Sequence, residues 1–232
     1  MQMNTAKAQP PFRHLDYVEA RIDVIRRDNG EMLLRSPHPM RTPAPNLIEP
    51  LRRWALVQPD HTWLAQRGAD GEWRHLSYAA ARAGVDAIAQ ALLDRGLGPA
   101  DTVMILSGNS IEHALMTYGA IAAGVPVAPV SQAYSLMSGD FAKLRFVFEL
   151  IAPRVIFVQS GSQFAKAFDV LDLDGVEIVH VAEPPPGRAA TSFQSLLDTP
   201  VGPAVDAAYG RLTHDTVCKY LFTSGSTGMP RR

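Results

Sequence analysis

TVMILSGNSIEHALMTYGAIAAGVPVAPV, residues 102–130, is the stretch of sequence that decides the fold. It begins with a short apolar run, residues 102–107, which predicts a buried β-strand. The Gly108-Asn109-Ser110 turn leads into a segment with helical spacing of apolar residues, which Gly124 closes. A second apolar run follows at residues 125–130. Strand, helix and strand in this order predict two parallel strands joined by a crossover helix.

The same alternation continues along the chain, and we expect further strands and helices on both sides of this unit. Ser77 is the expected N-cap of a long helix, and Gly96 lies where a helix of that length needs a left-handed residue. Continuous apolar strands alternating with amphipathic helices indicate an α/β fold, a parallel sheet with helices on both faces. The further strands are expected at residues 155–159, 176–181 and 217–222, and the helices at 77–94, 139–151, 162–170 and 192–197.

Upstream of this sheet the sequence predicts a short helix and a hairpin. Asn46 can cap a helix that Pro59 ends. Residues 63–66 and 73–76 alternate around Ala69-Asp70-Gly71, which predicts two antiparallel strands joined by a turn.

Residues 1–45 differ from the rest because prolines interrupt them and no helical period is sustained. Apolar residues flank an Asp28-Asn29-Gly30 turn, so two short strands are expected there. We therefore divide the chain into an N-terminal extension, residues 1–45, that packs on a larger body, residues 46–232.

Composition excludes several classes of protein. The 232 residues include 22 Lys plus Arg and 23 Asp plus Glu, a balance that argues against a dedicated nucleic-acid-binding protein. The single cysteine, Cys218, excludes a disulfide within the chain and fits a reducing compartment. The N-terminus lacks the apolar stretch of a secretory signal, and the longest apolar run, residues 119–130, is too short and too broken to span a membrane. We therefore expect a cytoplasmic protein with no nucleic-acid or membrane partner.

The segment that carries chemistry is YLFTSGSTGMPR, residues 220–231. It follows the last expected strand, and ligands gather at the carboxyl ends of strands in open α/β sheets. Its glycines let the backbone approach a ligand closely, its hydroxyls can donate to phosphate oxygens, and its arginine adds a forked positive charge. The sequence therefore predicts a phosphate-binding loop, the alternative being a Ser/Gly-rich surface loop. The expected binding residues are Thr223, Ser224, Gly225, Ser226, Thr227, Gly228 and Arg231.

Other chemical loops fit this segment less well. A Walker A loop would need glycine at position 230, which is proline. A dinucleotide fingerprint fails at Gly96-Leu97-Gly98, because Asp101 follows and a helix precedes it. The spacing around Ser224 and Ser226 does not give the G-x-S-x-G nucleophile elbow. A serine-loop amidohydrolase stays open as an alternative, although it would need a lysine base.

Residues 222–231 resemble the signature loop of the AMP-forming adenylate synthetases, the acyl-CoA synthetase and luciferase superfamily, over ten consecutive positions. The family usually has lysine where this chain has Arg231, a change that keeps the charge but alters its geometry. The resemblance extends upstream through WRHLSY, residues 73–78, and covers about residues 46–232. Residues 106–113 and 129–136, together with residues 33–37 of the extension, resemble feruloyl-CoA synthases more narrowly.

The resemblance implies a two-step ligase. A carboxylate attacks the α-phosphate of ATP, with Mg²⁺ assisting, and coenzyme A then displaces AMP from the acyl-adenylate. The signature loop would hold the β- and γ-phosphates. The family's adenine, ribose and carboxylate residues and its mobile lysine lie downstream of this loop, so we assign no catalytic residue. We expect an N-terminal portion of a ligase for a hydroxycinnamate such as ferulate, and we expect this portion to be inactive alone. The alternatives are a non-catalytic module that binds an anion or a partner, and one half of a split enzyme.

Several other residues of types that can bind metals or catalyse reactions have structural interpretations. The histidines share no metal-ligand spacing, so no metal site is expected. Cys218 is interpreted as a small buried hydrophobe, and Glu112 and Asp140 as helix-start carboxylates. Tyr134 is expected to pack or to face a substrate. The remaining candidates, interpreted as structural, are His113, His180, His214, Trp54, Trp63 and Trp73.

Overall fold

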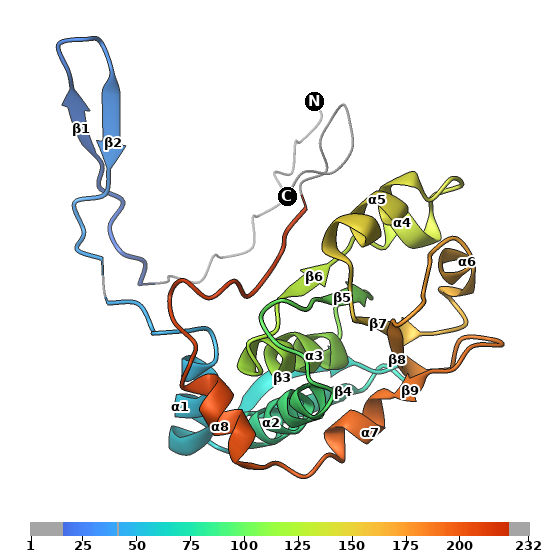
Figure 1. The fold of residues 1–232 in the computed structure, drawn as a ribbon. Helices are drawn as coiled ribbons and strands as arrows, with labels where there is room; N and C mark the ends of the chain where they lie inside the picture. Colours follow the sequence, from blue (N-terminus) through green and yellow to red (C-terminus); the bar gives the residue numbers. More distant parts are fainter. Residues whose placement is uncertain (1–15, 41, 223–232) are drawn as a thin grey trace, which may run out of the picture. The chain divides into compact units, whose positions relative to one another are not determined.

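The structure, a computed structural model, describes residues 16–40 and 42–222 (Figure 1). The chain divides into two compact units, residues 1–43 and 44–232. Each unit is described by itself.

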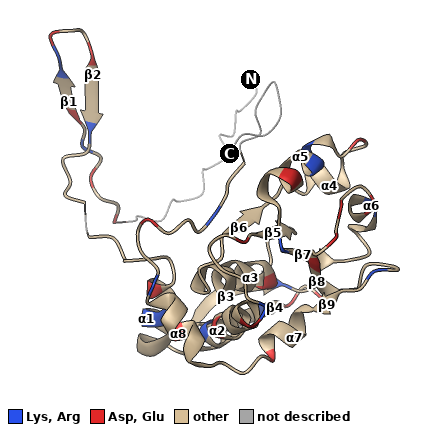
Figure 2. Ribbon diagram, in the orientation of Figure 1, with Lys and Arg blue, Asp and Glu red and all other residues tan. Residues whose placement is uncertain are grey.

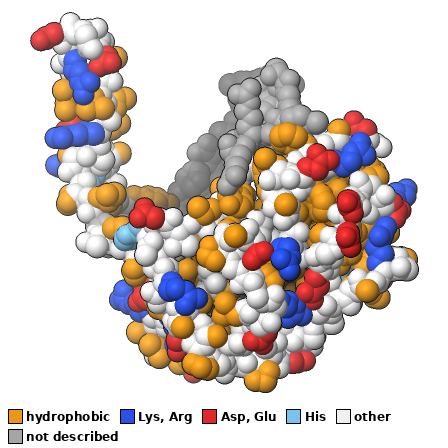
Figure 3. Space-filling model, viewed as in Figure 1, with side chains coloured by type: hydrophobic (Ala, Val, Ile, Leu, Met, Phe, Trp, Pro, Cys, Tyr) orange, Lys and Arg blue, Asp and Glu red, His pale blue; other side chains and the backbone are white. Residues whose placement is uncertain are grey.

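The described part of the first unit contains one antiparallel hairpin, as the sequence predicts. Strands β1 (Asp23–Arg26) and β2 (Met32–Arg35) pair with Val24 opposite Leu34. The turn between them needs Gly30, whose φ is +84°. Apolar side chains lie exposed along this hairpin (Figure 3), since Val24 is 52% and Leu34 63% exposed.

The second unit is built on a five-stranded sheet with the order β6-β5-β7-β8-β9. Every neighbouring pair is parallel, and Val103 of β5 lies opposite both Val127 of β6 and Val155 of β7. The predicted fold class, an α/β fold with a parallel sheet between helices, is therefore confirmed. The strands are β5 (Val103–Leu106), β6 (Val127–Pro129), β7 (Val155–Ser160), β8 (Glu177–Ala182) and β9 (Thr191–Ser192).

Helices cover both faces of this sheet and enclose one apolar core on each (Figure 1). Alternate residues of β5 separate the cores, because Val103 and Ile105 belong to one and Met104 and Leu106 to the other. The helices on the first face are α1 (Glu49–Val57), α2 (Tyr78–Asp94), α3 (Ile111–Ala122), α7 (Phe193–Leu197) and α8 (Pro203–Tyr209), and those on the second are α4 (Ala133–Leu136), α5 (Ala142–Ile151) and α6 (Ala165–Phe168).

The boundaries of α2 and the end of α3 lie where the sequence predicts them, whereas α1 begins after its predicted cap and has Ile48 as its N-cap residue. The Ser77 hydroxyl accepts from the Ala80 N–H at 3.2 Å where α2 begins, and Gly96 has φ +73° where it ends. Gly124, with φ +79°, follows the end of α3. Asn46 lies three residues before α1, and its side chain accepts from Glu49 N–H at 2.9 Å.

A second antiparallel hairpin packs its apolar face on the first core. It consists of β3 (Thr62–Arg67) and β4 (Trp73–Ser77), as the sequence predicts. The indole of Trp63 lies edge-on to the ring of Tyr118 on α3, with centroids 5.1 Å apart. Trp73, in contrast, is 53% exposed beside Arg67, so it is not a core residue.

The side chain of Arg52 ties α1 to its neighbours α2 and α8. Figure 2 shows basic residues on α1 and α2, and Arg52 donates to Asp86 at 3.5 Å and to Asp206 at 2.8 Å. Its guanidinium also lies 4.0 Å from the centroid of the Tyr209 ring. These contacts fix α8, which the sequence did not predict.

The predicted strand at residues 217–222 is wrong, and β9 takes the fifth place in the sheet instead. This segment makes only an isolated parallel bridge to β6, in which Val127 N–H donates to Cys218 O and Tyr220 N–H donates to Val127 O. The next donor on that edge of β6 would be residue 129. Because Pro129 has no N–H, the ladder cannot continue. The short elements α4 and β9 were also not expected.

Candidate functional site

The residues predicted to bind phosphate lie outside the described part of the chain. These are Thr223, Ser224, Gly225, Ser226, Thr227, Gly228 and Arg231. The structure does describe the segment that leads to them, and this segment defines which edge of the sheet it reaches. Because the Val127–Lys219 bridge is parallel, residues 217–222 run in the same direction as the strands. Phe222, the last described residue, therefore follows toward the carboxyl edge, where it packs against the second core.

The carboxyl edge contains a topological switch point between β5 and β7. The chain leaves β5 to form β6 on one side and then crosses to form β7 on the other. In open α/β sheets the connections diverge at such a point and leave a crevice in which ligands bind. Here the hydroxyl of Ser110, which follows β5, donates to Gln159 Oε1 on β7 at 3.0 Å. One hydrogen bond thus joins the two strand ends across the switch point.

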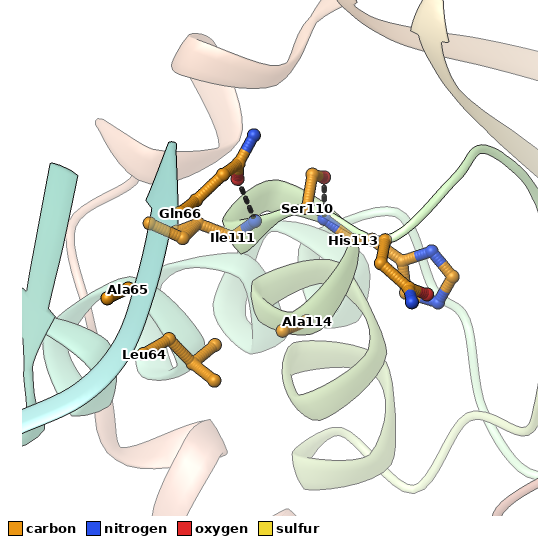
Figure 4. A pocket seen from close by; sticks show the side chains of 8 residues that line it. Leu64, Ala65, Gln66, Ser110, Ile111, His113 and Ala114 are labelled. Atoms are coloured by element: carbon orange, nitrogen blue, oxygen red, sulfur yellow. Dashed lines mark hydrogen bonds between the residues drawn. The ribbon is translucent and has the colours of Figure 1, made fainter. Parts of the chain in front are cut away.

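The turn after β5 is fixed by side chains from two directions (Figure 4). Within the turn, Ser110 Oγ accepts from the His113 N–H at 3.0 Å and so caps α3. From the hairpin, Gln66 Oε1 accepts from the Ile111 N–H at 2.8 Å. A cavity of about 290 Å³ lies between these elements, lined by residues 64–66 and by residues 109–111, 113 and 114. Two of the donors at the start of α3 are therefore already bonded within the protein.

The imidazole of His113 is held by the end of β5. Its Nδ1 lies 2.8 Å from the Ser107 hydroxyl and 3.1 Å from the Gly108 carbonyl oxygen. Burial lowers the pKa of His113 below its ordinary value, the hydrogen bond to Gly108 acts in the opposite direction, and the charge of Lys219 lowers the pKa further. The ring is therefore neutral near pH 7. Since Gly108 O can only accept, Nδ1 carries the proton in this arrangement.

The other candidate carboxylates have structural partners. Glu112, in the first turn of α3, accepts from the guanidinium of Arg74 at 2.6 Å, a contact that the sequence did not predict. Asp140 accepts from the Ala142 N–H at 3.1 Å and from the Ser138 hydroxyl at 3.0 Å. These hydrogen bonds, the backbone one first, lower the pKa of Asp140.

The remaining candidates are distributed over the unit and do not converge. Tyr134 packs on the second core and lies 5.5 Å from the ammonium of Lys143. Cys218 packs on the first core, and His214 contacts the Ala44 carbonyl oxygen at 3.2 Å. Within residues 16–40 and 42–222, no group of three His, Cys, Asp or Glu side chains could hold a metal ion. The same described residues include no helix that is long and apolar enough to cross a membrane.

Sequence reasoning missed the polar network around the β5–α3 turn. Its members come from strand β3 (Gln66), from the β5–α3 turn (Ser107 and Ser110) and from strand β7 (Gln159). The sequence contained only part of the signal for this network, namely the small polar residues that directly follow the apolar strand β5. The glutamines lie 45 and 49 positions from their partners, so their contacts depend on the tertiary fold.

Comparison with protein families gives one match that covers most of the chain. The model described as "AMP-binding enzyme" matches residues 51–231. Among curated proteins, the long-chain-fatty-acid–CoA ligase FadD15 of Mycobacterium tuberculosis is 27% identical over 183 residues, 75% of this chain and 28% of that protein. A probable CoA ligase, CCL9, of Humulus lupulus is 28% identical over 159 residues, 68% of this chain and 28% of that protein. The chain thus spans 28% of the length of these two relatives.

Solved structures of low sequence identity share the fold. The acetoacetyl-CoA synthetase from Streptomyces lividans aligns with a TM-score of 0.64 at 20% identity, over 78% of this chain and 29% of that one. The fatty acyl-adenylate ligase from L. pneumophila, solved with acyl adenylate and pyrophosphate, aligns with a TM-score of 0.55 at 18% identity, over 80% of this chain and 29% of that one.

Proposed function

Because the chain belongs to the AMP-binding enzyme family, we propose that it forms the first part of the adenylating domain of an ATP-dependent carboxylate–CoA ligase. In this proposal residues 46–232 belong to that domain, and residues 1–45 are an extension. The observation that carries the proposal is the direction of the segment that precedes the signature loop. Residues 217–222 run parallel to β6 toward the carboxyl edge, directly before the hydroxyl- and glycine-rich sequence.

The proposed role of residues 223–231 is to bind the β- and γ-phosphates of ATP. In the first step the carboxylate oxygen would form a bond to the α-phosphorus, and the bond from that phosphorus to the leaving pyrophosphate would break. The hydroxyls of Thr223, Ser224, Ser226 and Thr227 would donate to the leaving group, and Arg231 would neutralise its charge. Mg²⁺ would enter with ATP, whose phosphates supply the oxygen ligands that this ion prefers. Coenzyme A would then displace AMP and form the thioester.

We further propose a hydroxycinnamate such as ferulate as the acyl substrate. This rests on the resemblance of residues 106–113 and 129–136 to feruloyl-CoA synthases. The first of these segments forms the end of β5, the turn and the start of α3, and the second follows β6. Both therefore lie at the carboxyl edge, toward which residues 217–222 also run. The 232-residue chain alone is proposed to bind the nucleotide without turning over.

The test is titration calorimetry of the 232-residue chain with Mg·ATP, using adjacent arginines as a matched pair. Arg231→Gln should weaken binding about ten-fold or more, because it removes one charge-assisted hydrogen-bonding group, whereas Arg232→Gln should change it little. Equal effects of the two substitutions would refute the role of Arg231. Pyrophosphate release that depends on ferulate would refute the proposed inactivity of the chain alone.

We propose as a second candidate that the chain acts as one half of a split enzyme, or as a non-catalytic module that binds an anion or a partner. The glycines and hydroxyls of residues 223–228 support anion binding in either case. Ferulate-dependent pyrophosphate release that appears only on mixing with a polypeptide carrying the downstream part of a ligase would favour the split enzyme. Binding of ATP without activity in any mixture would favour the module.

A further inference from the structure

A second cavity, of about 370 Å³, lies at the amino end of the sheet. Its walls include Leu97, which precedes β5, and Gly124, which precedes β6. Residues before parallel strands lie at the amino edge, so this cavity is at the opposite end of the sheet from the switch point. Its volume is within the range of small-molecule sites, about 300–1,000 Å³.

Most of the cavity wall is apolar. Leu93 and Leu97 line it from the end of α2, Ala123 from the end of α3, and Ala208 and Leu212 from α8 and the residues after it. Leu97, Ala123, Ala208 and Leu212 are less than 10% exposed. These walls suit a branched aliphatic group.

Two opposite charges line the same cavity without pairing. Arg211 and Asp215 are both exposed, and neither forms a salt bridge with the residues that the structure describes. A guanidinium is a forked donor for a carboxylate. The ends of α2 and α3 add the partial negative charge of helix C-termini, which together with Asp215 favours an ammonium group.

We propose that this cavity binds a small aliphatic α-amino acid as its zwitterion. The ligand carboxylate binds Arg211, its ammonium group lies toward Asp215 and the helix ends, and its side chain enters the wall of leucines and alanines. This combination of one apolar and two opposite charged groups matches an amino acid better than a simple amine or a simple acid. The cavity at the start of α3 has fewer free hydrogen-bond donors for a ligand. Gln66 and Ser110 already accept from two backbone N–H groups at the start of this helix (Figure 4).

The site is independent of the proposed adenylation chemistry, but one segment connects the two. Val217 and Tyr220 line the cavity, and the same segment continues to Phe222, directly before the proposed phosphate loop. An amino acid in the cavity would therefore contact the chain that leads to the loop. Amide signals of Val217 and Tyr220 report on this contact.

The test is an NMR titration of the ¹⁵N-labelled 232-residue chain with L-leucine. We expect saturable shifts at Leu97, Arg211 and Val217 with a dissociation constant of about 1 mM or lower. Two matched compounds each lack one charge, 4-methylpentanoate without the ammonium and 3-methylbutylamine without the carboxylate. Each should bind at least about ten-fold more weakly than leucine. Binding of either compound as tight as that of leucine would overturn the zwitterion assignment.

Two substitutions test the named side chains. Arg211→Gln and Asp215→Asn should each weaken leucine binding about ten-fold, and since both residues are exposed the fold should persist. The control is Arg53→Gln at another exposed arginine, which lies outside the cavity, and it should leave the binding unchanged. The absence of saturable shifts at about 10 mM leucine in the unmodified chain would overturn the proposal.

Discussion

Replacing Gly119 by alanine should destabilise the second unit, although the same change stabilises most helices. Alanine in a helix is favoured over glycine by about 1 kcal/mol. At Gly119 of α3, however, an added Cβ would lie 2.5 Å from Cγ2 and 2.6 Å from Cβ of Ile88 on α2. Carbon atoms in contact are ordinarily about 3.5–4.0 Å apart, so a shift of about 1 Å is required.

The size of the stability loss caused by Gly119→Ala depends on whether the Ile88 side chain can move away from the added Cβ. Its Cβ is fixed to the backbone of α2 and its χ1 angle is restricted in a helix, so a change of rotamer cannot relieve the contact. The two helices must separate, at an overpacking cost of about 3 kcal/mol, the upper part of the usual range. Subtracting the propensity gain leaves a net loss of about 2 kcal/mol, which lowers the Tm by about 4–8 °C in a unit of this size.

Urea unfolding followed by circular dichroism measures this loss, and α2 offers a matched control. A Cβ at Gly84 would lie 3.3 Å from Cδ2 of Leu115 and from Cδ2 of Leu197, and 3.7 Å from Cδ1 of Leu115. These are the ends of flexible side chains, so Gly84→Ala should be neutral or stabilising by up to about 1 kcal/mol. If Gly119→Ala proved as stable as the unmodified chain, the close approach of α2 and α3 would be refuted.

Two further predictions concern the sheet and the turn after β5. Burial raises the pKa of Glu177, but hydrogen bonds from Arg95 and Thr191 outweigh it and hold the pKa below 4.5. The charged form is thus favoured in the folded state, so the stabilisation relative to Glu177→Gln should be full above about pH 5 and decrease as the pH falls through the lowered pKa. A difference in unfolding free energy that stays constant down to about pH 3 would contradict this reasoning. Ser110→Ala removes both the cap of α3 and the bond to Gln159, and should cost about 2 kcal/mol in urea unfolding, whereas Ser77→Ala removes only a cap and should cost about 1 kcal/mol. If the two substitutions lowered the unfolding free energy equally, the Ser110–Gln159 hydrogen bond would add nothing to stability.

The sequence was sufficient for the elements whose signals are local. The cap at Ser77, the turn at residues 108–110 and the glycines with positive φ at positions 96 and 124 each act within a few residues, and all lie where they were predicted. Apolar runs likewise predicted the four strands β5–β8, because buried parallel strands are apolar on both faces.

The errors lie where a distant partner decides the structure. Residues 217–222 have the composition of a strand, yet their pairing depends on β6, in which Pro129 removes a donor 90 positions away. Helix α8 is fixed by Arg52 on α1, which no local pattern encodes. For the candidate site, the phosphate loop was predicted from residue types and the resemblance, and it stays a prediction because it lies outside the described residues.

The strand order has a consequence for how the chain acquires its structure during synthesis. Val103 of β5 pairs with Val127 only 24 residues later, but with Val155 only after 52 residues. Loop-closure entropy favours the shorter connection, so β5 and β6 can associate while the later strands are still being made. Strands β7, β8 and β9 then add outward from β5 in the order of translation. The bridge from Lys219 to β6 forms last, on an edge that was among the first to fold.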